Sequence, residues 1–199
     1  MARPTKDDAR HLLMKAGASG MDTSKLLWRL LSLDPSLTAT GYALLGRNHE
    51  GKLVVADAGI IRPEKAKAPT QFRVDAICGQ VREVIREHSP STVIVECPTH
   101  KQHTRQAHKL SGLPLWGMLS GAVYATCREM SGAPLCVDMV SNEWTRGTTK
   151  LARQRQIAAI VNSYHPTLDR GADVSDAIAM ALWWLDEGAQ RSGLSWRTC

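Results

Sequence analysis

The sequence of 199 residues lacks the evenly paired cysteines typical of exported proteins and the long apolar runs typical of membrane proteins. Its five cysteines are odd in number, and none has C-x-x-C spacing, so no disulfide framework is expected and a reducing compartment is favoured. No apolar run approaches a membrane span, and Asp7 and Asp8 interrupt the place of a signal peptide's apolar centre. We therefore expect a protein of a reducing cytosol or nucleoplasm.

Acidic residues are outnumbered, since 25 lysines and arginines stand against 19 aspartates and glutamates. A net charge of +6 serves solubility, but it also favours a polyanionic partner such as nucleic acid. The chain has no internal repeat or low-complexity segment, and its length suits one domain with a full core. We expect a basic N-terminal extension at 1–25, a folded domain at 26–188 and a tail at 189–199.

Three apolar runs near the beginning of the folded domain predict three strands in close succession. The run "LLWRLLSLD" is too apolar to alternate, which is typical of a strand buried on both faces. The runs "TGYALLGR" and "KLVVADAGIIRP" follow, with "NHEG" between them as a hairpin turn. This order predicts an antiparallel meander.

Helices and strands alternate in the remainder of the chain. A helix is predicted at 70–88, a strand at "STVIVE", a helix at 105–130 offset by Pro114, a strand at "APLCVDMV" and helices at 150–163 and 172–187. The first of these helices has an apolar face made of Phe72, Val74, Ile77, Val81, Val84 and Ile85. The pattern predicts an α/β domain with a mixed sheet.

Carboxylates stand at the ends of two predicted strands, where Asp34 and Glu96 are found. Either acid alone is better explained as a cap or a surface acid. Asp173 and Asp176 add a pair at positions i and i+3 on one helix face. Asp173 suits a helix cap, because acids near a helix N-terminus are favoured by the dipole. Asp176 is followed by an unbroken apolar stretch, so its carboxylate is expected at the edge of a buried face.

Gathered carboxylates repel one another unless cations compensate them. Mg²⁺ is the natural compensator, because it is a hard ion that takes a few carboxylates together with phosphate oxygens. Two such ions can clamp the attacking and leaving oxygens of a phosphodiester displacement. A basic chain with an acidic centre therefore predicts a metal-dependent nuclease.

The motifs "LDPSLTATGYAL", "VIVECPTH" and "ADVSDAIAMAL" resemble, in order, those of the RuvC-type Holliday junction resolvases of the RNase H-like superfamily. The resemblance covers residues 28–188 and implies an RNase H-like fold with a five-stranded mixed sheet flanked by helices. It also implies a homodimer that resolves four-way DNA junctions by paired symmetric nicks. After Glu96 the chain has Pro98, Thr99 and His100 where some members carry an aromatic wedge, which favours a divergent member, phage-encoded or organellar.

The resemblance also implies a role for each acid, with Mg²⁺ as the cofactor, Mn²⁺ as a substitute and two ions per site. Asp34 would bridge both ions, Glu96 would ligate one of them, and Asp176 would hold a metal from the helix. Asp173 would assist or position the nucleophilic water. The alternatives are a related nuclease acting on other branched DNA or on RNA–DNA hybrids, and a junction-binding protein without cleavage. The four acids argue against the last, because a pure binder has no use for carboxylates that repel phosphate.

Two basic blocks are candidates for phosphate contacts, with a solvated surface as the alternative reading. The candidate residues are Lys101, Arg105, Lys109, Arg146, Lys150, Arg153 and Arg155. The first block also carries Cys97, His100, His103 and His108, which resemble zinc ligands. No second pair of cysteines follows, so structural zinc is the less favoured reading.

The helix expected near 108–130 has more apolar residues than one buried stripe needs. We therefore expect it to form much of a two-fold dimer interface, which suits the symmetry of a four-way junction. The alternative is that both of its faces pack inside one subunit. The residues concerned are Leu110, Leu113, Leu115, Trp116, Met118, Leu119, Val123 and Tyr124.

Overall fold

The computed structural model describes residues 23–98, 113–130, 132, 134–145, 147–161, 169 and 172–188. Five strands in this part of the chain form one mixed sheet in the order β3-β2-β1-β4-β5. The strands are β1 (Arg29–Asp34), β2 (Thr40–Arg47), β3 (Leu53–Ile61), β4 (Thr92–Cys97) and β5 (Leu135–Val140). The predicted mixed sheet of five strands is confirmed. Among the described helices, none combines the length and hydropathy that a membrane crossing requires.

The first three strands form the antiparallel meander that the sequence predicts. The amide of Gly51 donates to the carbonyl of Asn48 at 2.8 Å, and the turn takes a φ of 77° at Gly51 that glycine adopts without strain. β4 then pairs with β1 in parallel, and β5 pairs with β4 in parallel. The C-terminal ends of β1, β4 and β5 therefore meet at one edge of the sheet.

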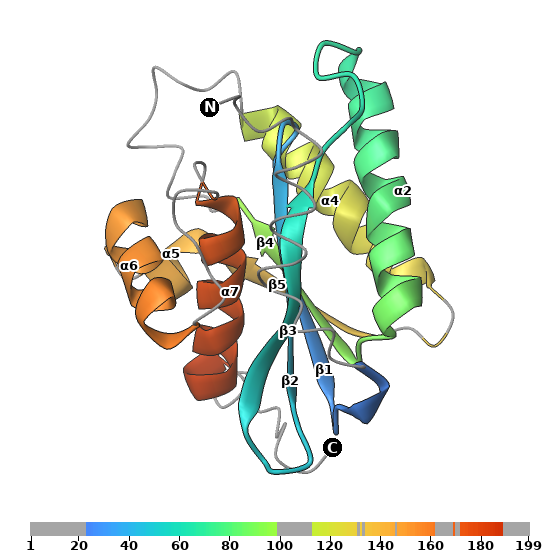
Figure 1. The fold of residues 1–199 in the computed structure, drawn as a ribbon. Coiled ribbons are helices and arrows are strands. Elements are labelled where there is room, and N and C mark those ends of the chain that lie inside the picture. Colours follow the sequence, from blue (N-terminus) through green and yellow to red (C-terminus); the bar gives the residue numbers. More distant parts are fainter. Residues whose placement is uncertain are drawn as a thin grey trace, which may run out of the picture.

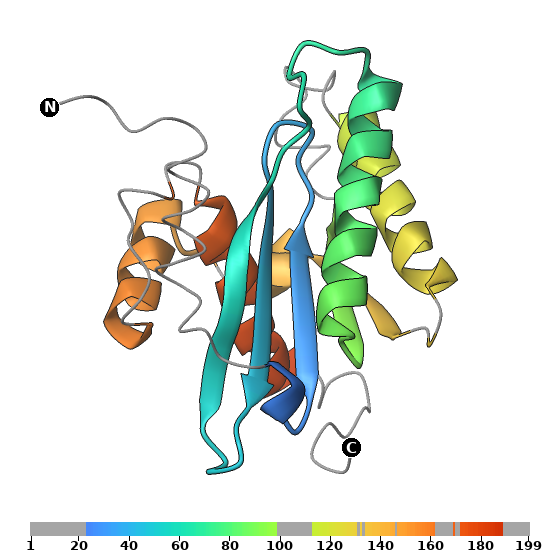
Figure 2. The same cartoon turned by 45° about the vertical axis from the view of Figure 1, so that its right-hand side comes forward.

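Two helical layers cover the sheet, as Figure 1 shows. On one face lie α2 (Thr70–His88) and α4 (Leu113–Glu129), which pack against each other. On the other face α7 (Asp173–Trp183) lies across β1 and β2, with α6 (Lys150–Ile160) and the short α5 (Ser141–Thr145) outside it. The turned view in Figure 2 shows the sheet between the layers. The 3-10 turn η1 (Thr23–Lys25) and the π-helical turn η3 (Trp184–Gly188) complete the elements.

β1 contributes side chains to both hydrophobic cores, because alternate side chains of a strand point to opposite faces. Leu31 and Leu33 lie in the core under α2 and α4, while Leu30 lies in the core under α7. Ser32 also faces α7, and its hydroxyl donates to the carbonyl of Ala177 at 2.6 Å. This buried hydrogen bond fastens α7 to the central strand.

The structure corrects three details of the helix predictions. Phe72 is not part of the buried face of α2: it is 66% exposed, because Val74 lies two residues, or about 200°, further round the helix. Pro114 falls in the first turn of α4 and does not offset the middle of the helix. Leu119 and Val123 are fully buried within the subunit, so they belong to its core and not to an interface.

Other predicted features keep their place or fall outside the described residues. α6 is capped by Thr149, whose hydroxyl accepts a hydrogen bond from the Ala152 amide at 3.2 Å. α5 begins at Ser141, and the side chains of Ser141 and Asn142 lie outside the described part. Residues 105–112 of the predicted middle helix also lie outside it.

The N-terminal end of α7 rests on the backbone of β2 at Gly41. A Cβ atom at this position would lie 2.0 Å from the carbonyl oxygen of Asp173, closer than any two such atoms can approach. Only a glycine therefore allows the helix to come this near to the strand.

We expect Gly41→Ala to lower the free energy of unfolding by about 1–3 kcal/mol or more, because the helix must move away from the sheet. Gly79→Ala is the matched control: it lies inside α2 with nothing within 4 Å of its added Cβ. There the change should stabilise the protein by about 0.5–1 kcal/mol through helix propensity. Urea unfolding of both variants checks the prediction, and a Gly41→Ala protein as stable as the unchanged chain contradicts it.

Candidate active site

Asp34 and Glu96 are brought together by the pairing of the two central strands. Leu33 of β1 is in register with Val95 of β4, so the next residues, Asp34 and Glu96, end neighbouring parallel strands at the same edge. Glu96 is only 6% exposed. The sequence places each acid at the end of a strand, and the register makes them neighbours.

The contact at Gly41 adds the acids of α7 to this pair. Asp34 is in register with Gly41 of β2, and Gly41 in turn lies against the backbone of Asp173. Asp176 follows one turn later and is 4% exposed. Asp173 and Asp176 both lie near enough to Asp34 for their charges to raise the pKa of its carboxyl. All four acids predicted from the sequence therefore gather at one edge of the sheet.

The beginning of α7 is held by Asp169, an acid that the sequence reading missed. Its carboxylate is fully buried and accepts hydrogen bonds from the amides of Val174 at 3.2 Å and Ser175 at 2.9 Å. Asp169, and not Asp173, thus caps the helix, which leaves the Asp173 side chain available to the site. The signal in the sequence is an acid shortly before the helix, but "LDRGAD" offers two acids and does not say which of them turns inward.

The pKa of Asp34 is raised well above its ordinary value. Burial is the largest cause, followed by the charge of Glu96, a hydrogen bond between the two carboxyl groups, and the charges of Asp176 and Asp173. Burial also raises the pKa of Asp173, and Asp169 and Asp176 add to this, while Lys150 and Arg62 act in the opposite direction. The acids of the centre therefore lie close enough together to disfavour the charge on Asp34 and Asp173.

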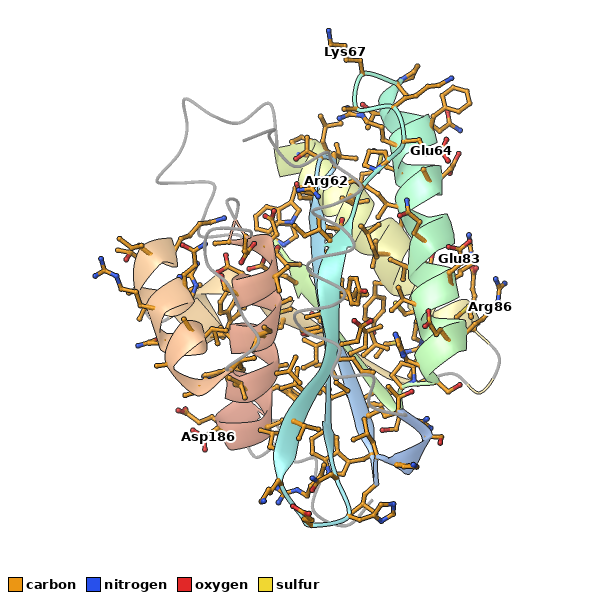
Figure 3. The ribbon with its side chains drawn as sticks, viewed as in Figure 1. Arg62, Glu64, Lys67, Glu83, Arg86 and Asp186 are labelled. Carbon is orange, nitrogen blue, oxygen red and sulfur yellow. The ribbon has the colours of Figure 1, made fainter. Side chains whose placement is uncertain are left out.

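Three cations lie close to the acids. Arg153 of α6 is buried and makes two charged hydrogen bonds to Asp176, from Nε to Oδ1 at 2.8 Å and from Nη2 to Oδ2 at 3.1 Å. Lys150 is more exposed, with its Nζ 3.7 Å from Oδ2 of Asp176. Arg62 follows β3, and Figure 3 shows it at the same end of the molecule as the beginning of α2.

The residues present fit a divalent metal by the chemistry of their donors. Carboxylate oxygens are the ligands that Mg²⁺ and Mn²⁺ prefer, and the crowding of carboxyl groups that raises the pKa of Asp34 is a repulsion that a bound cation relieves. Among the described residues, no group of three or more His, Cys, Asp or Glu side chains already has the arrangement of a metal cage. Asp176 turns both of its oxygens toward Arg153 instead.

The predicted DNA-binding residues are only partly described. Lys101, Arg105, Lys109 and Arg146 lie outside the described residues, whereas Lys150 and Arg155 are exposed on α6. Arg153 is 7% exposed and its guanidinium contacts protein acceptors, so the structure places it inside the site and not on the surface. Its predicted contact with DNA stays a prediction.

The zinc reading is also only partly described. His100, His103 and His108 lie outside the described residues. Burial raises the pKa of the Cys97 thiol to about 11, with Asp138 and Glu96 adding to the shift. The zinc reading and its alternatives at this segment therefore stay predictions.

Comparisons with known proteins agree with this geometry. The family model described as "Crossover junction endodeoxyribonuclease RuvC" matches residues 30–184. The curated proteins of that name from Synechocystis sp. and Chlorobium chlorochromatii are 28% and 30% identical, over 81% and 85% of this chain and 93% and 85% of their own.

A solved structure, "T. thermophilus RuvC in complex with Holliday junction substrate", is similar in fold. Its TM-score is 0.56 at 19% identity, and the match covers 80% of this chain and 96% of that one. Together with the strand order, this likeness confirms the predicted RNase H-like fold. The chain therefore belongs to the RuvC family of crossover junction endodeoxyribonucleases, which are metal-dependent nucleases.

Proposed function

We propose that this protein cuts four-way DNA junctions by paired symmetric nicks, with two Mg²⁺ ions held by Asp34, Glu96, Asp173 and Asp176. The observation that carries the proposal is the hydrogen-bonded pair of the partly buried Asp34 and the buried Glu96, beside the two acids of α7. Such a cluster is costly for folding alone, because buried like charges repel and each loses its hydration. Its presence in a family of junction endonucleases is explained by a metal centre.

Each side chain has a task that follows from its place. When bound, the ions would supply charge that polarises the scissile phosphate and acidifies the attacking water. Asp34 ends the central strand β1 and would hold both ions, with Glu96 beside it. Asp173 is half-buried at the beginning of α7, where it can orient the nucleophilic water. Lys150 is exposed next to Asp176 and is placed to contact a phosphate.

The proposed compartment is the cytoplasm of a bacterial or phage-infected cell. Both curated relatives named above come from bacteria. The four cysteines among the described residues are free thiols, as a reducing compartment requires.

The alternatives are cleavage of other branched DNA or RNA–DNA hybrids, and junction binding without cleavage. A panel of four-way junctions, forks, flaps and hybrids, incubated with Mg²⁺ or Mn²⁺, separates them. Preferred symmetric cutting of four-way junctions supports the proposal. Cutting of hybrids alone, or binding without any cut, rejects it.

Single substitutions of the acids test the metal assignment. We expect Asp34→Asn, Glu96→Gln and Asp176→Asn to abolish cleavage while junction affinity stays equal or rises, because each removes a ligand and one charge that repels phosphate. Asp173→Asn should retain some activity. Single-turnover cleavage and gel-shift affinity check this. A near-normal cleavage rate for any of the first three variants removes that residue from the metal site.

The salt dependence of DNA binding tests whether the first basic block contacts phosphates. Changing Lys101, Arg105 and Lys109 together to Ala should weaken binding to every junction sequence and flatten the plot of log affinity against log salt concentration. The expected loss is about one unit of slope for each phosphate contact removed. Filter binding or fluorescence anisotropy at several salt concentrations measures the slope. An unchanged slope shows that these residues face away from DNA.

The proposed dimer uses the outer face of α4. Leu115 and Met118 are 38% and 46% exposed there, and the helix beside them is open at Gly121, where nothing lies within 4 Å of an added Cβ. A stripe of this kind, next to the fully buried Leu119, can pack against its own copy without disturbing the core.

We expect Met118→Glu to give a folded monomer that cuts junctions poorly, because a charge is placed in the interface. Ile160→Glu is the control, since it adds the same charge to a 63% exposed position of α6 and should leave the mass unchanged. Sedimentation with and without a junction gives the mass, and circular dichroism reports folding. The dimer is rejected if the unchanged protein is a monomer on saturating junction yet makes paired symmetric cuts.

A further inference from the structure

Arg153 is a cation enclosed within the acidic centre. Its side chain is 8% exposed and that of Asp176 is 5% exposed, and the two join in the bidentate contact described above. A carboxylate held in this way has one lone pair on each oxygen occupied. Asp176 is thus the only one of the four acids for which the structure records such a two-oxygen contact with a described cation.

The guanidinium of Arg153 is fixed from its other sides as well. Nη1 donates to the carbonyl of Thr148 at 2.6 Å and lies 3.4 Å from the hydroxyl of the same residue. The guanidinium carbon lies 5.0 Å from the ring centre of Trp144, which is a cation–π distance. Arg153 therefore ties the residues around α5 and the beginning of α6 to α7, and its head has little freedom to turn away.

Two physical properties distinguish this contact from an ordinary surface ion pair. Arginine does not lose its proton in proteins, so the charge beside Asp176 is permanent. The pair is buried, so water and salt screen its charge only weakly. Any divalent ion that binds Asp176 must approach an oxygen that already faces a fixed positive charge.

We propose that Arg153 is a positioning residue that holds the Asp176 carboxylate in one orientation before metal binds, and that lowers the affinity of the site for metal. The proposal rests on the proposed function in one respect, which is that Asp176 is a metal ligand. Arg153 leaves Asp176 only the lone pairs on the side of the carboxylate away from the guanidinium, which favours one geometry of the bound ion over several. The site is thereby formed in advance and binds its metal weakly.

A merely structural tie between α6 and α7 predicts something different. Removing such a tie lowers stability by the same amount with and without metal. Removing a built-in counter-ion also changes the metal concentration that the site needs. Metal-dependent thermal stability separates the two roles without any DNA, because a ligand that binds the folded state raises the melting temperature.

The experiment titrates Mn²⁺ and, separately, Mg²⁺ against the melting temperature of the full chain and of Arg153→Met. We expect Arg153→Met to melt lower than the unchanged protein without metal, and to reach half of its metal-induced rise at a concentration about fivefold lower, because one repelling charge is gone. At saturating metal it should cut junctions about tenfold more slowly, because Asp176 is no longer oriented. Tighter metal binding with slower cleavage is the expected signature.

Two further variants complete the test. Arg155→Met removes one exposed charge from the same helix, and its half-saturating metal concentration should stay within about twofold of that of the unchanged protein. Arg153→Lys keeps the charge but lacks the fork, so its metal concentration should also stay within about twofold while cleavage slows. If Arg153→Met does not fold by circular dichroism, Arg153→Lys decides, and normal cleavage by that variant overturns the proposal.

The outcomes also separate this inference from the proposed function. If the unchanged protein shows a metal-induced rise and cuts junctions, but folded Arg153→Met needs as much metal or more, only the role of Arg153 is overturned. If the unchanged protein shows no metal-induced rise and cuts nothing, both proposals are rejected.

Discussion

The structure depends on the crowding of like charges at one edge of its sheet. Asp34 and Glu96 end neighbouring strands in a buried place, where their repulsion is screened far less than in water. A core does not need such a pair, and several contacts exist to keep it in place. Ser32 fastens α7 to β1, Asp169 caps α7, and Arg153 neutralises Asp176. These three polar contacts of the interior thus hold the acids in place.

Much of the fold could be predicted from the sequence, because the decisive patterns are local. The meander follows from three apolar runs with a turn at Gly51, and the helices follow from periodicity with their ends near Pro, Gly or Thr. The acids were found for the same reason, since a carboxylate at the end of an apolar strand contrasts with the residues before it. Whether these acids lie close together depends on the register of the strands. The hydrophobic pattern alone does not predict that register, whereas the resemblance to a family implied it.

The residues that sequence reasoning placed differently are those whose role depends on distant partners. Arg153 is one of several cations in a basic helix, and only the packing of α6 against α7 turns it inward. Phe72 is an apolar residue on a helix with a buried face, yet it lies outside that face, whereas Leu119 of the expected dimer helix is fully buried within the subunit. Apolar character predicts burial somewhere, whereas the face that is buried depends on the angle at which a helix meets its neighbours. The amino-acid composition of a helix does not predict that angle.

The absence of a side chain at Gly41 has a consequence for any attempt to redesign this centre. The distance from β2 to α7 is set by backbone resting on backbone, so the separation between the strand acids and the helix acids is a property of the scaffold. Exchanging Asp for Glu or His changes the reach of one ligand but leaves that separation as it is. A centre tuned for a larger ion would have to be built on a different hairpin, with the ligands chosen afterwards.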